Sequence, residues 1–265
     1  MDRLIGEVRS AYEDLFAFVS GLERSDWDRV TAFYGWTVWD EIAHLMGADR
    51  IALAALNDPD AFKAAAENGA RRRRENQSMQ DDYRNQFGHL DPPALLEVWR
   101  SAFEALLAEV APLAPDKRLP WMGPDMSARS FASARHMEVF AHGQDIYDVI
   151  RRRRVLDDSI RNIVIIGVNT FGWTYATRKM DKPPAPRVEL IAPSGELWIY
   201  REDGEGLVRG PAEDFCLVVT QRRHVDDTEL ETQGAVARQW MELAQCFAGP
   251  PADGPAPGVR KVVYA

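Results

Sequence analysis

The sequence predicts an α+β protein, with an antiparallel helical bundle over residues 1–180 and a small α+β domain over residues 185–265. Two observations support this division. Apolar residues recur at spacings of three and four through most of the first part, which is the period of helices that bury one face. After the proline-rich segment 182–186, short apolar runs flank Pro193-Ser194-Gly195, a pattern typical of two strands joined by a turn.

Four long amphipathic segments are expected to form the bundle. The first covers residues 2–21. The second is expected to begin after Thr37, a good N-cap with Asp40 in capping-box position, and to run to about Leu56. The third follows Pro92-Pro93, and the fourth covers Ser127 to Arg154. We also expect polar helical structure over 60–89 and a further helix over 157–178.

The predicted second domain is less regular. Strands are expected at 188–191 and 197–200, with a third at about 207–210. Residues 215–220 are short and apolar, and they fit either a strand or a helix. Residues 234–248 have the spacing of a helix, and the tail after them is rich in proline and glycine.

Composition limits the classes of function. The chain has 265 residues and a formal net charge of -9, which disfavours non-specific nucleic-acid binding. No apolar run approaches the ~18 residues of a membrane span, and the first residues do not resemble a signal peptide. We therefore expect a cytoplasmic protein. A monomer or a homodimer that acts on a small molecule is expected, although composition does not establish either property. Cys216 and Cys246 lie in apolar contexts that fit buried free thiols.

The most informative chemistry lies in the predicted helix 127–154. At ~100° per residue, His142 falls on the same face as Glu138, inside a stripe that otherwise faces a core. Burying an unpaired carboxylate costs several kcal/mol, so Glu138 needs a partner. The two side chains could pair with each other, or both could bind a divalent metal ion. His136 points ~160° away from Glu138 and is expected to face solvent.

A third candidate ligand, His44, lies two turns into the predicted helix 37–56. Asp40, one turn earlier, could hold the second nitrogen of its imidazole, as carboxylates do for metal-bound histidines. The alternative is a core histidine without a metal. Because bundle cores are known metal sites, we predict that His44, Glu138 and His142 converge on one ion. The Pro- and Gly-rich segment 112–126 could roof such a site. The chain contains no GxGxxG, P-loop, GxSxG or HExxH motif.

Two segments resemble a known family. Trp39-Asp40-x-x-x-His44-Leu45 and, about a hundred residues later, Arg135-x-Met137-Glu138-x-x-Ala141-His142-Gly143-Gln144-Asp145 resemble the mycothiol-dependent maleylpyruvate isomerase family, which belongs to the DinB-like metal-binding bundles. The segment Trp240–Pro251 resembles an uncharacterised actinobacterial branch. The resemblance implies a DinB-like four-helix bundle followed by a sterol-carrier-like α+β domain, covering almost the whole chain.

The resemblance also implies a chemistry. His44, Glu138 and His142 would hold zinc and leave one position open, although the same donors suit iron(II), nickel or manganese. A small thiol such as mycothiol would bind there as a thiolate, for isomerisation or S-transfer on a small, possibly carboxylated substrate. Arg222, with Arg223 adjacent, would bind the substrate carboxylate.

Two alternatives to this function remain open at the level of sequence. One is a hydrolase or lyase that uses metal-activated water. The other is a non-catalytic ligand-binding protein in which the metal ion only stabilises the fold. A fourth protein ligand, such as Asp145 or His89, would favour the non-catalytic alternative.

Overall fold

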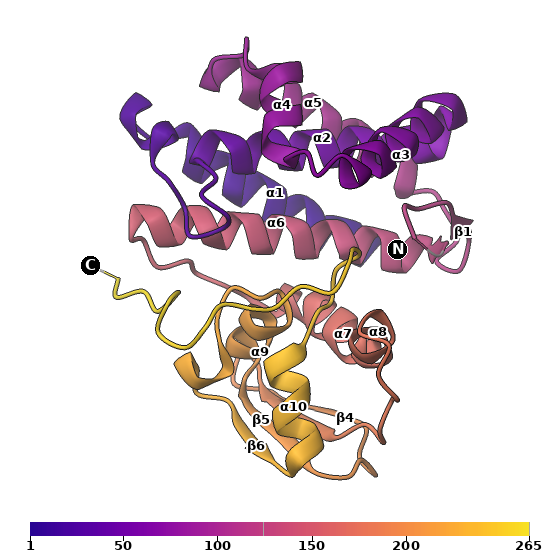
Figure 1. Cartoon of the computed structure of the whole chain (residues 1–265), viewed down its shortest axis with the longest axis vertical. Coiled ribbons are helices and arrows are strands. Elements are labelled where there is room, and N and C mark those ends of the chain that lie inside the picture. The colour runs from indigo at the N-terminus through magenta and orange to yellow at the C-terminus, as the bar shows by residue number, and fades with distance from the viewer. Residues whose placement is uncertain (124, 265) are drawn as a thin grey trace. The chain divides into compact units, whose positions relative to one another are not determined.

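The structure, a computed structural model, describes residues 1–123 and 125–264 and divides into two compact units, Met1–Arg152 and Arg153–Ala265. The first unit is mainly helical, and the second contains helices and a four-stranded sheet (Figure 1). The predicted α+β class, with an N-terminal four-helix bundle and a small C-terminal α+β part, is confirmed.

Four long helices form the bundle: α1 (Asp2–Ser20), α2 (Val38–Asn57), α5 (Pro92–Val110) and α6 (Ala128–Ile150). α1 and α6 lie side by side, and α2 packs against both α5 and α6 (Figure 1). The ends of α1 and α2 lie within a residue or two of those expected. α6 is shorter than predicted, because Arg151 adopts a left-handed conformation with φ 60° that caps the helix before the arginine run ends.

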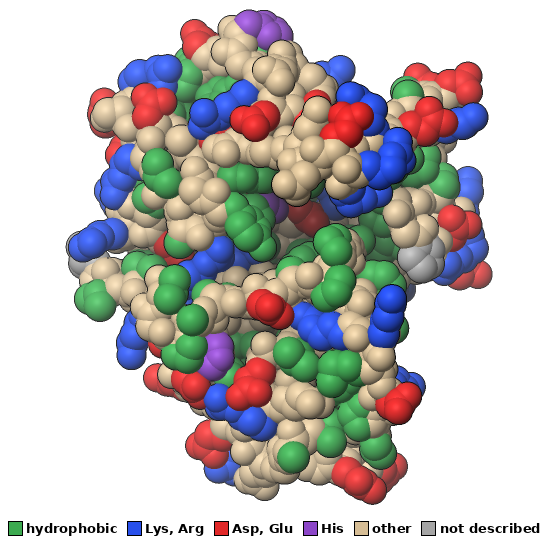
Figure 2. Space-filling view, in the orientation of Figure 1, with side chains coloured by type: hydrophobic (Ala, Val, Ile, Leu, Met, Phe, Trp, Pro, Cys, Tyr) green, Lys and Arg blue, Asp and Glu red, His purple; other side chains and the backbone are tan. Residues whose placement is uncertain are grey.

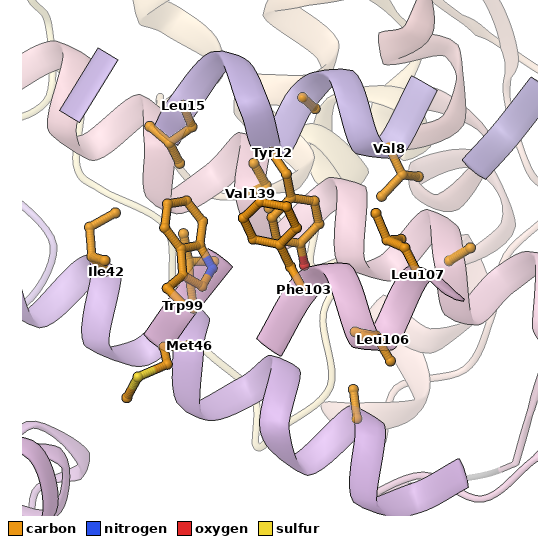
Figure 3. Close-up of a cluster of buried hydrophobic side chains, with 14 of the residues drawn as sticks. Val8, Tyr12, Leu15, Ile42, Met46, Trp99, Phe103, Leu106, Leu107 and Val139 are labelled. Carbon is orange, nitrogen blue, oxygen red and sulfur yellow. The ribbon is translucent and has the colours of Figure 1, made fainter. Parts of the chain in front are cut away.

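Aromatic and aliphatic side chains fill the centre of the bundle (Figure 3). Tyr12 of α1 and Trp99 of α5 are fully buried, with ring centroids 5.9 Å apart. Ile42 and Met46 of α2 and Val139 of α6 are fully buried as well. Each such side chain stabilises the fold by about 1.5–3 kcal/mol. These contacts fix the two segments of α2 and α6 from which the predicted metal ligands project.

The polar stretch between α2 and α5 forms two short helices, α3 (Pro59–Arg74) and α4 (Met79–Phe87), that pack on α2. Among their residues only Tyr83 is buried. Its ring lies against the bare backbone of Gly47, where an added Cβ would come within 2.4 Å of the tyrosine Cε1 atom. Glycine at this position therefore allows α4 to place an aromatic side chain directly on α2.

The proline-rich segment before α6 contains two short paired strands, β1 (Arg118–Leu119) and β2 (Met126–Ser127). Trp121, in the connection between them, packs edge-on against Phe131 of α6 with ring centroids 5.3 Å apart. Pro124 lies outside the described residues. The segment thus covers the beginning of α6, and Ser127 caps this helix by accepting a hydrogen bond from the backbone of Ser130.

The second unit is built on a sheet with strand order β4-β3-β5-β6. β3 and β5 are parallel and the other pairs are antiparallel. The predicted hairpin at Pro193-Ser194-Gly195 joins β3 to β4, and the ambiguous residues 215–220 fall mainly in α9. The elements are η2 (Asp158–Ile160), α7 (Arg161–Asn169), α8 (Phe171–Thr177), β3 (Arg187–Ile191), β4 (Leu197–Tyr200), β5 (Leu207–Pro211), α9 (Ala212–Val219), η3 (Val225–Asp227), β6 (Glu231–Gln233) and α10 (Ala235–Leu243).

The division between the units falls at Arg152, about thirty residues before the predicted linker. Helices α7 and α8, which the sequence analysis assigned to the bundle, pack on α9 and α10 instead. Phe171 of α8 lies edge-on to Trp240 of α10 at 5.1 Å, and Gly167 of α7 packs closely against Phe215 of α9. These helices complete the core of the second unit, and the chain passes between units in the arginine run after α6.

The helices and the distribution of surface charge both agree with the composition. No helix among the described residues is long and apolar enough to cross a membrane. Basic and acidic side chains are interspersed on the face of the molecule seen in Figure 2.

Candidate metal centre

Helices α2 and α6 bring the three predicted ligands together. Nε2 of His44 and Nε2 of His142 lie 3.2 Å and 3.4 Å from the same atom, Oε2 of Glu138. One ligand atom from each of the three residues lies within 4.8 Å of the others. His44 comes from α2, and Glu138 and His142 come from successive turns of α6, as their spacing of four residues predicts.

A fourth residue, Glu41, orients the cluster and was not anticipated. Its side chain is completely buried, and its Oε2 atom lies 2.7 Å from Nδ1 of His142. The hydroxyl of Thr31 donates a hydrogen bond of 2.7 Å to the other oxygen, Oε1. An ionised Glu41 would accept a hydrogen bond from Nδ1 of His142 and leave Nε2 to face Glu138. Carboxylates hold metal-bound histidines in this way in many metalloproteins.

Asp40 does not orient His44, so that prediction is wrong. Its carboxylate forms the capping box of α2 with Thr37, as expected, and also accepts hydrogen bonds from Arg84 and Gln80 of α4. Burial alone would raise the pKa of Asp40, but these hydrogen bonds outweigh it and hold the pKa below its usual value. The residue therefore anchors α4 to the start of α2. Among the described residues, Nδ1 of His44 has no hydrogen-bond partner.

The electrostatics of the cluster favour an ionised Glu138. Burial acts to raise its pKa, but the hydrogen bonds with His142 and His44 and the charge of Arg135 outweigh burial and hold the pKa well below its usual value. Nε2 of His142 lies 3.4 Å from Oε2 of Glu138, close enough for the two atoms to share a proton or a cation. Two imidazoles and a carboxylate around one point are a donor set that suits a divalent cation.

Aromatic side chains enclose the cluster within the first unit. The indole of Trp36 stacks on His142 at 5.9 Å, and the ring of Phe33 meets it edge-on at 5.0 Å. Tyr83 meets His44 edge-on at 5.7 Å. Side-chain exposures of 13% for His44 and 19% for Glu138 show that the cluster is partly open to ligands. These walls would limit the access of water while leaving one side of the cluster reachable.

The other candidate residues are not part of the group formed by His44, Glu138 and His142 among the described residues. Arg222 belongs to the second unit, where it is buried and its Nη1 atom donates to the carbonyl oxygen of Thr220; its predicted role in binding a substrate carboxylate stays a prediction. His136 is only 2% exposed, so the expectation that it faces solvent is wrong. α6 is buried on more than one face. Asp145 is absent from the group formed by His44, Glu138 and His142 but forms a second, buried group with Glu41 and His142, and His89 belongs to neither group among the described residues.

A second buried charge pair lies next to the cluster. Arg135, on the turn of α6 before Glu138, is 4% exposed and lies 3.7 Å from Oδ1 of Asp49, a fully buried residue of α2. The hydroxyl of Tyr12 donates to Oδ1 of Asp49 at 2.5 Å, and the indole of Trp99 donates to Oδ2 at 3.1 Å. The core of the bundle thus contains a charged carboxylate held by three helices.

The buried Asp49 predicts a measurable pH dependence. Burial raises its pKa to about 6, although Arg135 and the hydrogen bonds from Tyr12 and Trp99 act in the opposite direction. Between about pH 4 and pH 6 the folded protein keeps a proton that the unfolded chain has lost, so stability falls as pH rises through this window. A shift of about two units corresponds to about 3 kcal/mol.

We therefore expect the free energy of unfolding of the metal-free protein, minus that of Asp49→Asn, to fall by about 2 kcal/mol from pH 4 to pH 7. Urea unfolding at intervals across this range measures the difference, and the subtraction cancels groups that titrate alike in both proteins. A difference that stays constant with pH would show that Asp49 titrates at its ordinary value.

Comparisons with known proteins agree with this geometry. A family model described as the mycothiol maleylpyruvate isomerase N-terminal domain matches residues 8–147. Two relatives, uncharacterised proteins from two strains of Mycobacterium tuberculosis, are each 36% identical over 256 residues, covering 94% of this chain and 97% of theirs.

Solved structures share the fold. The crystal structure of a mycothiol-dependent maleylpyruvate isomerase is similar with a TM-score of 0.51 and 16% identity, covering 82% of this chain and 87% of that chain. A histidine-to-alanine mutant of such an isomerase matches over the same shares with a TM-score of 0.52 and 14% identity. At this identity the likeness establishes the fold alone.

Proposed function

Because the chain belongs to the family of the mycothiol maleylpyruvate isomerase N-terminal domain, we propose that it is a metal-dependent enzyme that uses a small thiol, such as mycothiol, for isomerisation or S-transfer on a small, carboxylated substrate. One observation carries the proposal. Two imidazoles and a carboxylate from α2 and α6 turn their ligand atoms toward one point, within 4.8 Å of one another.

His44, Glu138 and His142 would hold the ion, and zinc suits two nitrogen donors and one carboxylate oxygen. Three protein ligands leave at least one position of a tetrahedral ion open, which is typical of catalytic rather than structural zinc. Bound there, zinc would lower the pKa of a coordinated thiol, and the thiolate would add reversibly to a conjugated cis double bond of the substrate.

The protein's own residues support this chemistry in three ways. Glu41 fixes the ring orientation of His142 and, through Thr31, ties it to the loop before α2. The low pKa of Glu138 keeps its carboxylate ionised at neutral pH. Trp36 and Tyr83 place apolar rings beside the two histidines, and such walls strengthen electrostatic interactions by excluding water.

The proposal predicts thiol-dependent turnover. Zinc-loaded protein should convert maleylpyruvate to its trans isomer when mycothiol is present, and conversion should be absent without thiol and with Glu138→Gln. Chromatography of substrate and product measures the conversion, and titration of free thiol distinguishes the two reactions. Isomerisation returns the thiol unchanged, whereas S-transfer consumes one thiol for each product molecule.

Other outcomes would contradict the proposal. Metal-dependent conversion without any thiol would indicate activation of water. A zinc-loaded protein with no turnover and no detectable thiol binding would indicate a metal that only stabilises the fold.

A further inference from the structure

The two oxygens of Glu138 face different partners. Oε2 lies 3.2 Å and 3.4 Å from the imidazole nitrogens of His44 and His142. Oε1 instead lies 3.8 Å from Nη2 of Arg135, one turn earlier on α6. A carboxylate can bind a metal ion through one oxygen or through both, and the choice decides how many positions remain for other ligands. The environment of Oε1 therefore affects the chemistry of the site.

The guanidinium of Arg135 is held in place from several sides. Its Nη1 atom is 3.7 Å from Oδ1 of Asp49, and its Cζ atom lies 5.2 Å from the ring centroid of Trp121. Asp49 is itself fixed by hydrogen bonds from Tyr12 of α1 and Trp99 of α5. A side chain that is 4% exposed and tied to the bundle in this way has little freedom to leave Oε1.

The positive charge of Arg135 is not explained by a role in increasing the affinity for a metal ion. A cation beside a metal ligand repels a bound metal ion, so Arg135 gains nothing for metal affinity through its charge. Burying it also requires a second buried carboxylate, Asp49. An apolar residue at position 135 would need neither. The arrangement is explained if Arg135 controls how Glu138 binds the ion.

We propose that Arg135 is a positioning residue that keeps Oε1 of Glu138 away from the metal ion, so that Glu138 binds through Oε2 alone and a coordination position stays open for an exogenous ligand. Asp49 holds Arg135 in this place. The inference rests on the proposed metal site. Without the guanidinium, Oε1 is released, Glu138 binds through both oxygens, and the exogenous ligand loses its position.

Cobalt(II) tests this inference, because it replaces zinc in such donor sets and its visible absorption depends on the number, kind and geometry of its ligands. In Arg135→Met, we expect a visible spectrum that differs from that of the wild type at full cobalt occupancy, because Oε1 replaces the exogenous ligand. Affinity for 2-mercaptoethanol, followed by its thiolate-to-cobalt absorption band, should fall about tenfold. Affinity for cobalt itself should not fall, since a repulsive charge is removed and an oxygen donor is gained.

Controls separate this role from a general effect on the fold. Arg100→Met removes an arginine of α5 that pairs with Glu104 on the surface, and should leave the spectrum and thiol affinity unchanged. Arg135→Met leaves Asp49 without its cation. Folding is therefore checked by circular dichroism. If the single variant does not fold, the double variant Asp49→Asn/Arg135→Met, which removes both charges, is measured in its place.

The outcomes are distinguishable from those of the proposed function. If the wild type binds neither zinc nor cobalt, the proposed metal site is wrong. If the wild type binds cobalt and the folded variant has the same spectrum and the same thiol affinity, the metal site stands and the role of Arg135 is overturned. A fall in cobalt affinity with an unchanged spectrum overturns it as well.

Discussion

His44→Ala, Glu138→Gln and His142→Ala should each lower zinc affinity by about three orders of magnitude. Zinc bound by a full set of protein ligands has an apparent binding free energy of roughly 10–16 kcal/mol at neutral pH. Divided among three protein ligands, this is about 4 kcal/mol for each, or about 10³-fold in affinity. The three ligand atoms lie within 4.8 Å of each other, so each substitution removes one donor from a set of three.

Competition with a chromophoric chelator measures these affinities, and metal analysis of the purified proteins gives the occupancy. Zinc should also raise the melting temperature of the wild type, because a ligand at 100 times its Kd stabilises the folded state by about 2.7 kcal/mol. The three variants should show no such rise at the same zinc concentration. Wild-type affinity in all three would exclude the proposed site.

A matched control comes from His89, an exposed histidine between α4 and α5. His89→Ala removes an imidazole from the same unit without touching the cluster, and it should bind zinc as the wild type does. If His89→Ala lost as much affinity as His142→Ala, the zinc measured would be bound outside the predicted cluster.

The positions of these ligands could be predicted because they depend on local geometry. Glu138 and His142 are four residues apart, and helical geometry alone places them on one face. His44 required a long-range contact between α2 and α6, which periodicity cannot supply. That contact was predicted because bundle cores are known metal sites, and the motif around Asp40 and His44 supported it through the family resemblance. The capping box at Thr37 was also predictable, because both of its residues lie within one turn.

Glu41 could not be found in this way. An acidic residue in the first turn of a helix is ordinarily explained by the helix dipole, and nothing local indicates that this one is buried. Its partners, Thr31 and His142, are 10 and 101 residues away. Asp40 was instead predicted to orient the imidazole of His44, because it lies one turn away on the same helix. In the structure its oxygens are engaged by Thr37, Arg84 and Gln80.

The division of the chain was misplaced for a related reason. The proline-rich segment after Lys182 is a genuine change in local composition, but α7 and α8 are amphipathic and could pack on either unit. Their partners are decided by tertiary contacts such as that between Phe171 and Trp240. Local periodicity predicts that such helices bury a face, and it does not say against which neighbour.

The second large effect is expected at Glu41, because it acts on a ligand directly. Removing a carboxylate that holds a metal-bound histidine typically costs 10–100-fold in metal affinity. Glu41→Ala should lower zinc affinity by about 100-fold, since the ring of His142 loses its acceptor. Glu41→Gln keeps an acceptor of the same shape and removes only the charge, so we expect a loss of about tenfold.

Comparing the two substitutions separates orientation from charge. Equal losses in Glu41→Ala and Glu41→Gln would mean that the charge of Glu41 alone matters, through the basicity of His142. No loss in either, with a folded protein, would mean that packing against Phe33 and Trp36 is enough to orient the ring. Glu104→Gln on α5 removes an exposed carboxylate of the same bundle and serves as the control, with wild-type affinity expected.

Because Glu41 accepts a hydrogen bond from Thr31 in the loop before α2, a loss of zinc affinity in the Glu41 variants predicts a smaller loss in Thr31→Val. This substitution keeps the carboxylate and removes the hydroxyl that fixes it.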